Sequence, residues 1–154
     1  FLSWDTEDDR ARTMTANSGW NILSPGHAEG RLLGGNISTC TLLLGTDYQP
    51  NTADSIMFLE DEGSISPAIL QRHLQQLMQG GFFEGVRGIV FGRFQTTSKT
   101  DSKTLNSICR EIFENAQIPI IAGVDFGHTD PMLTLPFGKH VDLNTQEPKI
   151  RLTL

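Results

Sequence analysis

The 154-residue sequence has no cluster of positive charge and no long apolar segment. Lysine and arginine total 12 against 18 aspartates and glutamates, for a net charge of −6, and no two basic residues are adjacent. A protein that binds the backbone of a nucleic acid needs a basic surface, which this pattern does not predict. No apolar run approaches the roughly 18 residues of a membrane-spanning helix, and no signal-peptide pattern is present. We therefore expect neither a nucleic-acid nor a membrane partner.

Cysteine is also scarce, and the histidines lack metal-binding spacing. Cys40 and Cys109 are isolated, and each sits among the apolar positions of a predicted helix. This indicates buried thiols in a reducing compartment rather than a disulfide framework, and it favours the cytoplasm. No HxxH, HExxH or CxxC spacing occurs, which argues against a zinc site. We expect no metal and no cofactor.

The first twenty residues lack apolar periodicity. The chain begins with Phe1 instead of methionine, and four acidic residues fall between Asp5 and Asp9. We expect residues 1–20 to be a connecting segment of a longer polypeptide and residues 21–154 to form one domain. A cloning remnant or a processed N-terminus is the alternative interpretation.

The rest of the chain alternates between predicted strands and predicted helices. Alternation of this kind favours right-handed crossovers and a partly parallel sheet, so we expect an α/β domain with a mixed sheet and a terminal antiparallel section. A short apolar stretch at Leu32 and Leu33 is expected to meet a turn or a close approach at Gly34-Gly35. The predicted strands are 55–59, 86–91, 119–124, 133–135, 140–143 and 149–154, and the predicted helices run from Asn36 or Ser38 to Gly45, from Ser64 or Ser66 to Gly80, and over 102–115.

Two polar side chains stand where apolar strands end. Glu60 follows the strand 55–59, and His128 follows the strand 119–124 after a short loop. In open α/β sheets functional groups gather beyond the carboxyl ends of the strands, so both side chains are predicted to share one crevice. A carboxylate can fix the tautomer of an imidazole, whose other nitrogen then accepts a proton from a hydroxyl nucleophile. A solvated charge, or helix capping by Asp61 or Glu62, remains the alternative.

No residue of the chain is predicted to be the nucleophile. None of the serines stands in a G-x-S-x-G setting, and Ser64 and Ser66 are explained as helix caps. His73 lies on the apolar side of its helix and is predicted to be a packing residue. If this chain takes part in acyl transfer, the nucleophile must come from elsewhere.

Four blocks of the sequence resemble one peptidase family, in the family's own order. The family comprises the LD-carboxypeptidases and the microcin C immunity proteins, and the resemblance implies the C-terminal domain, a swivelling β/β/α fold. An N-terminal catalytic domain of the same polypeptide would supply the serine and the oxyanion hole, and Glu60 and His128 would complete a Ser–His–Glu triad without a cofactor. The blocks are AEGRLLGGNISTCTLLLGTDYQP (28–50), IMFLED (56–61), GIVFGRF (88–94) and DFGHTDPMLTLPFG (125–138).

The resemblance also implies substrate-binding residues and two candidate substrates. Asn36 is similar to a polar residue lining the family's cleft, although a helix N-cap explains it equally well, and Trp4 matches a tryptophan that stacks on a nucleobase. The sequences of residues 46–50 and 127–138 more closely resemble the immunity branch, which cleaves peptide–nucleotide conjugates, than the branch that removes terminal D-alanine from a muropeptide. A non-catalytic ligand-binding domain is the alternative of another class. The resemblance leaves a homodimer open.

Overall fold

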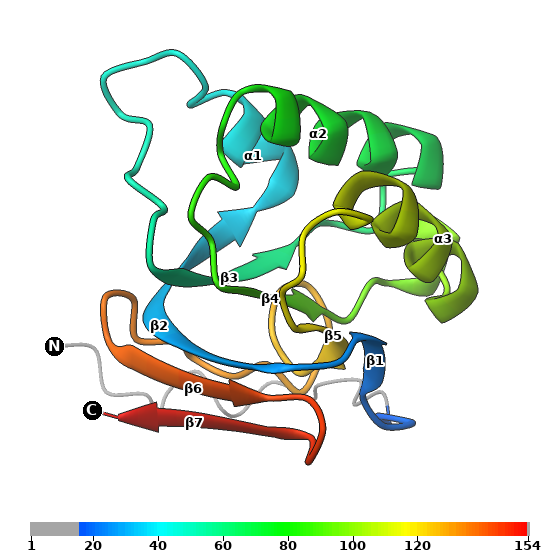
Figure 1. Cartoon of the computed structure of the whole chain (residues 1–154). Coiled ribbons are helices and arrows are strands. Elements are labelled where there is room, and N and C mark those ends of the chain that lie inside the picture. The colour runs from blue at the N-terminus through cyan, green and yellow to red at the C-terminus, as the bar shows by residue number, and fades with distance from the viewer. Residues whose placement is uncertain (1–15, 154) are drawn as a thin grey trace, which may run out of the picture.

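A computed structural model describes residues 16–153, whose strands form a 7-stranded sheet in the order β1-β5-β4-β3-β2-β6-β7. The fold confirms the expected α/β class with a mixed sheet and a terminal antiparallel section (Figure 1). The strands are β1 (Asn21–Ser24), β2 (His27–Asn36), β3 (Ser55–Glu60), β4 (Gly88–Gly92), β5 (Ile120–Val124), β6 (His140–Asn144) and β7 (Lys149–Thr153).

The centre of the sheet is parallel and its flanks are antiparallel. Strands β2, β3, β4 and β5 pair in parallel, so their carboxyl ends share one edge of the sheet. Strand β1 pairs antiparallel with β5, and β6 pairs antiparallel with both β2 and β7. The arrangement places the segments that follow β3, β4 and β5 side by side.

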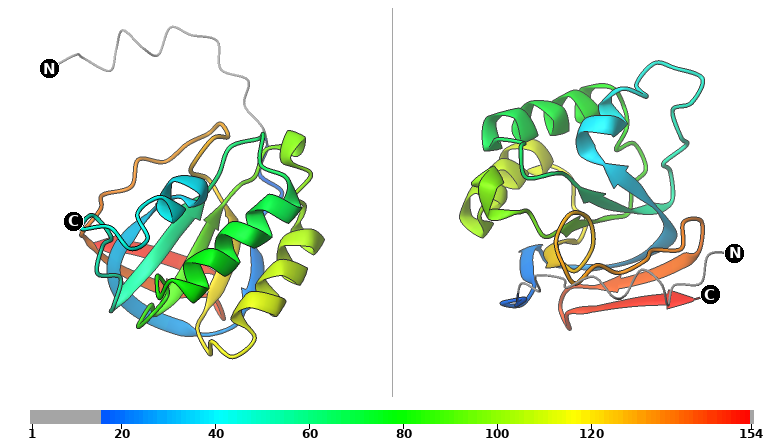
Figure 2. Two further views of the ribbon diagram at one scale, coloured as in Figure 1. Left: turned by 90° about the horizontal axis from the view of Figure 1, so that it is seen from above. Right: turned by 180° about the vertical axis from the view of Figure 1, so that it is seen from behind.

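The helices α1 (Ile37–Thr41), α2 (Pro67–Gln79) and α3 (Ser102–Phe113) lie on one side of this sheet, as the two further views show (Figure 2). Their starts follow from side-chain capping, because Asn36, Ser66 and Asp101 each accept a hydrogen bond from a backbone N–H in the first turn. Between residues 16 and 153, no helix combines the length and apolar character that a bilayer crossing requires.

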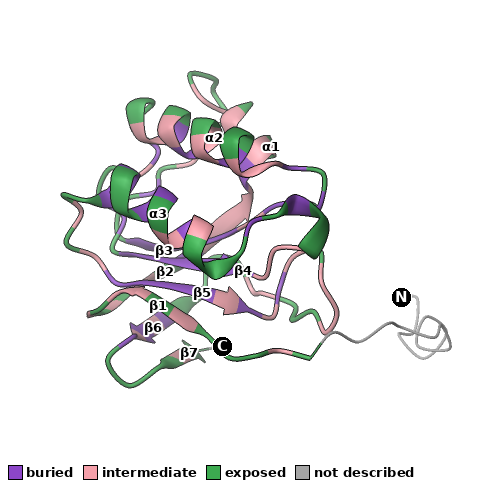
Figure 3. Cartoon of the chain, turned by 90° about the vertical axis from the view of Figure 1, so that its right-hand side faces the viewer, coloured by how far each residue is buried: buried purple, intermediate pink, exposed green. Residues whose placement is uncertain are grey.

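The sheet buries apolar side chains on both faces. One core packs α2 and α3 against the sheet through residues such as Leu74, Phe91 and Ile108. The second core lies on the other face, where Val141 and Leu143 of β6 cluster with Phe58 and other residues of the central strands. Figure 3 shows the result as buried strands beneath helices whose outer surfaces are exposed. The doubly buried centre explains why β3 reads as a continuous apolar run.

Gly34-Gly35 is the close approach, and not the turn, of the two alternatives that the sequence left open: β2 continues through both residues, and a β-carbon on Gly34 would lie 1.8 Å from the carbonyl oxygen of Phe58 in β3. Three other local features differ from the sequence-based expectations. Residues 133–135 form a loop, bounded by two prolines that donate no backbone hydrogen bond. Strand β1 was not predicted, and α1 ends at Thr41, before Gly45.

Candidate active site

Glu60 and His128 meet at the carboxyl edge of the sheet, although 68 positions separate them in the chain. The Nδ1 atom of His128 lies 2.5 Å from Oε2 of Glu60. The glutamate side chain is 12% exposed and the histidine side chain 48% exposed, so the acid is covered while the imidazole reaches the surface. Within residues 16–153 the second ring nitrogen, Nε2, has no hydrogen-bond partner. The pair has the orientation in which a carboxylate fixes an imidazole tautomer and leaves Nε2 open.

Two glycines allow this contact across an intervening strand. Strand β4 lies between β3 and β5, so the chain after β5 must cross the end of β4 to bring His128 to Glu60. A β-carbon on Gly92, the last residue of β4, would lie 2.6 Å from the Phe126 carbonyl oxygen and 3.1 Å from Cβ of Glu60. A β-carbon on Gly127 would lie 2.7 Å from Oε2 of Glu60. Both positions therefore need glycine for steric reasons, and Gly127 also has a φ of +97°.

The segment after β4 holds the histidine loop in place. Gln95 donates from Nε2 to the carbonyl oxygen of His128 at 2.7 Å, and the other end of its amide packs on Gly63, just after Glu60. Arg93 pairs with Asp125 at 2.8 Å and donates to the carbonyl oxygen of Asp130 at 2.9 Å. Gln95 thus links the two loops that carry the pair.

Asp61, next to Glu60, is 1% exposed and organises the adjacent polar groups. One carboxylate oxygen accepts from Nδ2 of Asn36 at 3.0 Å, and the other accepts from the backbone N–H and the hydroxyl of Ser38 at 2.9 and 2.7 Å. Asp61 therefore accepts hydrogen bonds from residues at the start of α1, and does not cap α2, which the sequence left as an alternative. Asn36 is the N-cap of α1, and it pairs across the parallel strands with Glu60, so it lies beside the candidate pair.

Ser38 and His73 form a serine–histidine contact, with the Ser38 hydroxyl 3.1 Å from Nδ1 of His73. The hydroxyl lies between Asp61 and His73, whereas in a catalytic triad the imidazole lies between the acid and the hydroxyl. The contact therefore orients side chains at the α1–α2 packing. His73 is half-buried and hydrogen-bonded, as a packing residue should be.

Neither thiol is suited to act as a nucleophile. Burial raises the pKa of Cys40 to about 11, with further contributions from the charges of Asp61 and Glu60. Burial alone raises the pKa of Cys109 to about 12. Both cysteines are free and buried, as the sequence predicted, and the neutral thiol is unreactive.

A cleft of about 810 Å³ opens beside His128. It extends along the segment after β4 to the start of α3 and is bordered by residues 16–19. Lys99 lines it and forms no ion pair with another residue of the described part of the chain. The cleft beside His128 offers hydroxyl groups and the cationic side chains of Arg93 and Lys99; its polar lining also includes Thr96, Thr97, Thr100 and Ser102.

Trp4 lies outside the described residues, so its predicted stacking role stays a prediction. Sequence reasoning missed Gly92, Gly127 and Gln95, whose importance depends on contacts between distant segments. A glycine directly after a buried strand was the available signal for Gly92, since it often marks close backbone approach.

The chain is a mixed α/β domain with polar side chains at the carboxyl ends of its parallel strands, and comparison with known proteins defines its family. Residues 29–143 match the model of the LD-carboxypeptidase C-terminal domain. The chain belongs to this family. It is 40% identical over 148 residues to a provisionally named carboxypeptidase of Treponema pallidum, covering 96% of this chain and 44% of that protein.

Two further relatives carry different names. The microcin C7 self-immunity protein MccF of Escherichia coli is 32% identical over 130 residues, covering 83% of this chain and 38% of MccF. A provisionally named murein peptide carboxypeptidase of Bacillus subtilis is 33% identical over 128 residues, covering 81% of this chain and 40% of the relative. The chain thus spans less than half the length of these curated relatives.

Solved structures agree with the fold. An MccF-like protein of Bacillus anthracis has a TM-score of 0.82 at 36% identity, with 96% of this chain and 46% of that chain covered. MccF in complex with aspartyl sulfamoyl adenosine has a TM-score of 0.76 at 29% identity, with 95% and 44% covered.

Proposed function

We propose that this chain is the C-terminal half of a serine-type amide hydrolase and carries Glu60 and His128 of a Ser–His–Glu triad. The observation that carries the proposal is the contact of 2.5 Å between Nδ1 of His128 and Glu60, with Nε2 open beside the cleft. The serine and the oxyanion donors would come from an N-terminal domain of the same polypeptide, joined through residues 1–20. The domain formed by residues 21–154 would then act only together with that half.

The geometry supports a specific division of roles. With Glu60 accepting a hydrogen bond from Nδ1–H, Nε2 is the basic nitrogen and takes the proton of the attacking serine. The serine attacks the amide carbonyl, backbone N–H groups of the other domain hold the oxyanion, and His128 then protonates the leaving amine. Glu60 stabilises the imidazolium formed in between, and its low exposure strengthens that interaction.

A non-catalytic binding domain is less consistent with the site. Such a domain has no need for a carboxylate and an imidazole held in hydrogen-bond contact by two sterically required glycines. Side chains directed to opposite surfaces would have supported it, whereas Glu60 and His128 face each other.

For the substrate, we favour a peptidyl- or aminoacyl-nucleotide conjugate. MccF, which has been solved with aspartyl sulfamoyl adenosine, shares nearly the whole of this chain's fold. Trp4 would stack on the base, an interaction worth about 1–3 kcal/mol. Asn36 does not line the cleft beside His128; it would contact the substrate on the Glu60 side in addition to capping α1. The alternative is a muropeptide tetrapeptide, which the murein peptide carboxypeptidase of Bacillus subtilis makes plausible by its name.

The test joins this chain to its natural upstream half and compares hydrolysis of the two substrates. We expect cleavage of an aspartyl sulfamoyl adenosine-type substrate, with Trp4→Ala reducing that reaction while leaving muropeptide cleavage unchanged. The 154-residue chain alone should cleave neither. Turnover by the isolated chain above the uncatalysed rate would contradict the proposed division of the triad.

A further inference from the structure

The outer face of β2 and β6 carries two histidines and two carboxylates. His27 and Glu29 are two residues apart on β2, so both side chains point to the same face, and His140 and Asp142 repeat this spacing on β6. The antiparallel register places Glu29 directly opposite Asp142. The alternate residues of β6, Val141 and Leu143, enter the second core, so the four polar side chains point away from it.

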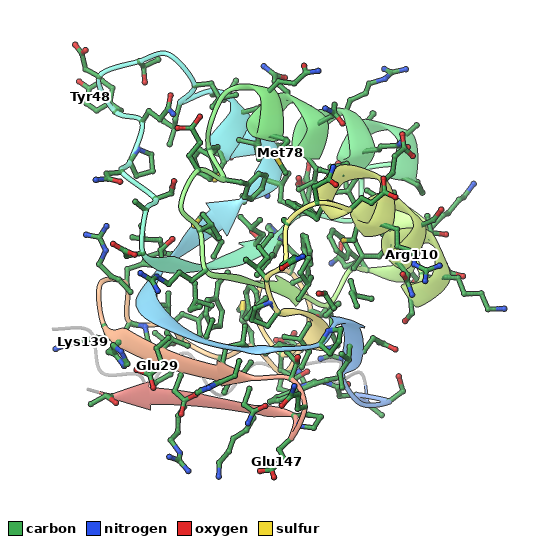
Figure 4. All side chains as sticks on the ribbon, in the orientation of Figure 1. Glu29, Tyr48, Met78, Arg110, Lys139 and Glu147 are labelled. Atoms are coloured by element: carbon green, nitrogen blue, oxygen red, sulfur yellow. The ribbon has the colours of Figure 1, made fainter. Side chains whose placement is uncertain are left out.

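The four side chains pair crosswise between the strands. Nε2 of His27 lies 2.8 Å from Oδ1 of Asp142, and Nε2 of His140 lies 3.5 Å from Oε2 of Glu29. One ligand atom from each of His27, Glu29 and Asp142 lies within 4.8 Å of the others. Glu29 is labelled beside β6 in Figure 4. Imidazole and carboxylate ligand atoms therefore converge from both strands.

This group has the chemistry of a transition-metal site. Zinc binds imidazole nitrogen and carboxylate oxygen at about 2.0–2.2 Å, so the ligand atoms of a tetrahedral ion lie roughly 3.4 Å apart. The observed separations bracket that value, and the side chains of His27, Glu29 and His140 are each more than half exposed and free to adjust. Two carboxylates balance the charge of a divalent ion, and imidazole favours zinc over magnesium or calcium.

Two arginines, Arg31 and Arg151, lie next to this group on the same face of β2, β6 and β7. Arg31 stands opposite His140, but its guanidinium donates to the carbonyl oxygen of Asn51 at 3.0 Å. Arg151 of β7 stands directly opposite Asp142 and is exposed. Arg151 is therefore the positive group best placed to weaken the binding of a second cation at Asp142.

We propose that His27, Glu29 and Asp142 form a binding site for a zinc-like divalent transition metal on the outer face of β2 and β6, with His140 next to it through its contact to Glu29. His27 is at the start of β2, whereas Asn36, beside Glu60, is at its end. The site is thus separate from the candidate active site and does not depend on the proposed function. The sequence motifs that argue against zinc consider spacing within one segment, whereas these ligands come from two strands.

The test uses the purified 154-residue chain after treatment with a chelator. Zinc chloride is titrated by calorimetry, and Co²⁺ is followed by the visible absorption of its tetrahedral complexes. We expect one ion per chain with a Kd below about 1 mM, and at least roughly 10-fold weaker binding for His27→Ala and Asp142→Asn. Glu147→Gln, in the turn between β6 and β7, should bind like the parent chain, and Arg151→Ala should bind more tightly.

Because the ligand side chains are at least partly exposed, replacing them should leave the fold intact, and circular dichroism verifies that each variant is folded. Absence of saturable binding, or binding unchanged in both His27→Ala and Asp142→Asn, would overturn the proposal. The same holds if His27→Ala lowers the melting temperature but zinc never raises that of the parent chain, since the contacts would then only join the two strands.

Discussion

Gly127 lies so close to Glu60 that a β-carbon on residue 127 would be 2.7 Å from Oε2 and 2.8 Å from Cβ of the glutamate. The loop that delivers His128 therefore passes over the acid with only a glycine between them. Gly92 at the end of β4 also lies close to Glu60 and Phe126. The contact of acid and imidazole therefore depends on glycine at both positions, because a side chain at either would clash.

Replacing Gly127 by alanine should disrupt the acid–imidazole pair. The added methyl group must push Glu60 or the histidine loop aside, and a misplacement of this size can cost about 10²-fold in rate. The positive φ adds a backbone penalty of about 1–2 kcal/mol. The measurement is kcat/KM of the joined protein together with the melting temperature.

Gly138→Ala is the matched control for this variant. Gly138 has a φ of +82°, but a β-carbon there would meet nothing within 4 Å. Both variants should lose the stability that a positive φ costs, Gly127→Ala more because its methyl group also meets Glu60, and only Gly127→Ala should lose activity. Equal activities would show that the close approach to Glu60 has no functional importance.

Gln95→Met should lower kcat by about 5-fold with little change in KM. The variant keeps the size of the side chain but removes the hydrogen bond of 2.7 Å to the His128 carbonyl, worth about 1 kcal/mol. Gln79→Met, on the exposed end of α2, controls for the loss of an amide. A rise in KM at unchanged kcat would instead place Gln95 in substrate binding.

Lys99→Met should raise KM for substrates that carry a free carboxylate. Lys99 lines the cleft beside His128 without an ion pair inside the described part of the chain, and a charge-assisted hydrogen bond is worth about 1.5–3 kcal/mol. We expect a KM increase of roughly 10-fold or more, and none for a substrate whose carboxylate is amidated. Lys103→Met, which removes a lysine that does not line the cleft, should behave like the parent. Equal effects of both variants would contradict the assignment.

Because both thiols are buried, the free energy of unfolding should fall as the pH rises above 9. Their pKa values are raised from 9.0 to about 11 for Cys40 and about 12 for Cys109, so the folded state holds protons that the unfolded state releases. The stabilisation is present below pH 9 and is lost as pH rises through the folded values, at up to about 1.4 kcal/mol per pH unit for each thiol. In urea unfolding across this pH range, the free energy of unfolding should fall less steeply with pH for Cys109→Ala than for the parent chain. The same slope for both proteins would contradict the raised pKa of Cys109.

Features that depend on strand ends and local pattern were predictable from the sequence. The alternation of strands and helices defined the α/β class, and parallel strands bring their carboxyl ends to one edge, which is why Glu60 and His128 could be expected to meet. Ser66 followed by Pro67 marked the start of α2 correctly, since capping is a local interaction.

Features that depend on contacts between distant segments were not predictable. The sequence could not decide between a turn and a close approach at Gly34-Gly35, because the approach of Phe58 is visible only once β2 and β3 are paired. Asp61 looked like a charge at the start of α2, yet it turns back to Asn36 and Ser38. The cross-strand cluster of His27 and Asp142 required the register of β2 and β6.

The most direct test of the central claim measures kcat of the joined protein on an aspartyl sulfamoyl adenosine-type substrate after changes at Glu60 and His128. Glu60→Gln keeps the shape of the side chain but cannot fix the reactive tautomer, and we predict losses of roughly 10³-fold or more for both Glu60→Gln and His128→Ala. Glu62→Gln, at a neighbouring carboxylate that accepts a hydrogen bond from the Ser64 hydroxyl, should retain activity. If either Glu60→Gln or His128→Ala, correctly folded, turned over substrate like the parent, the proposed acid–imidazole pair would not be the catalytic one.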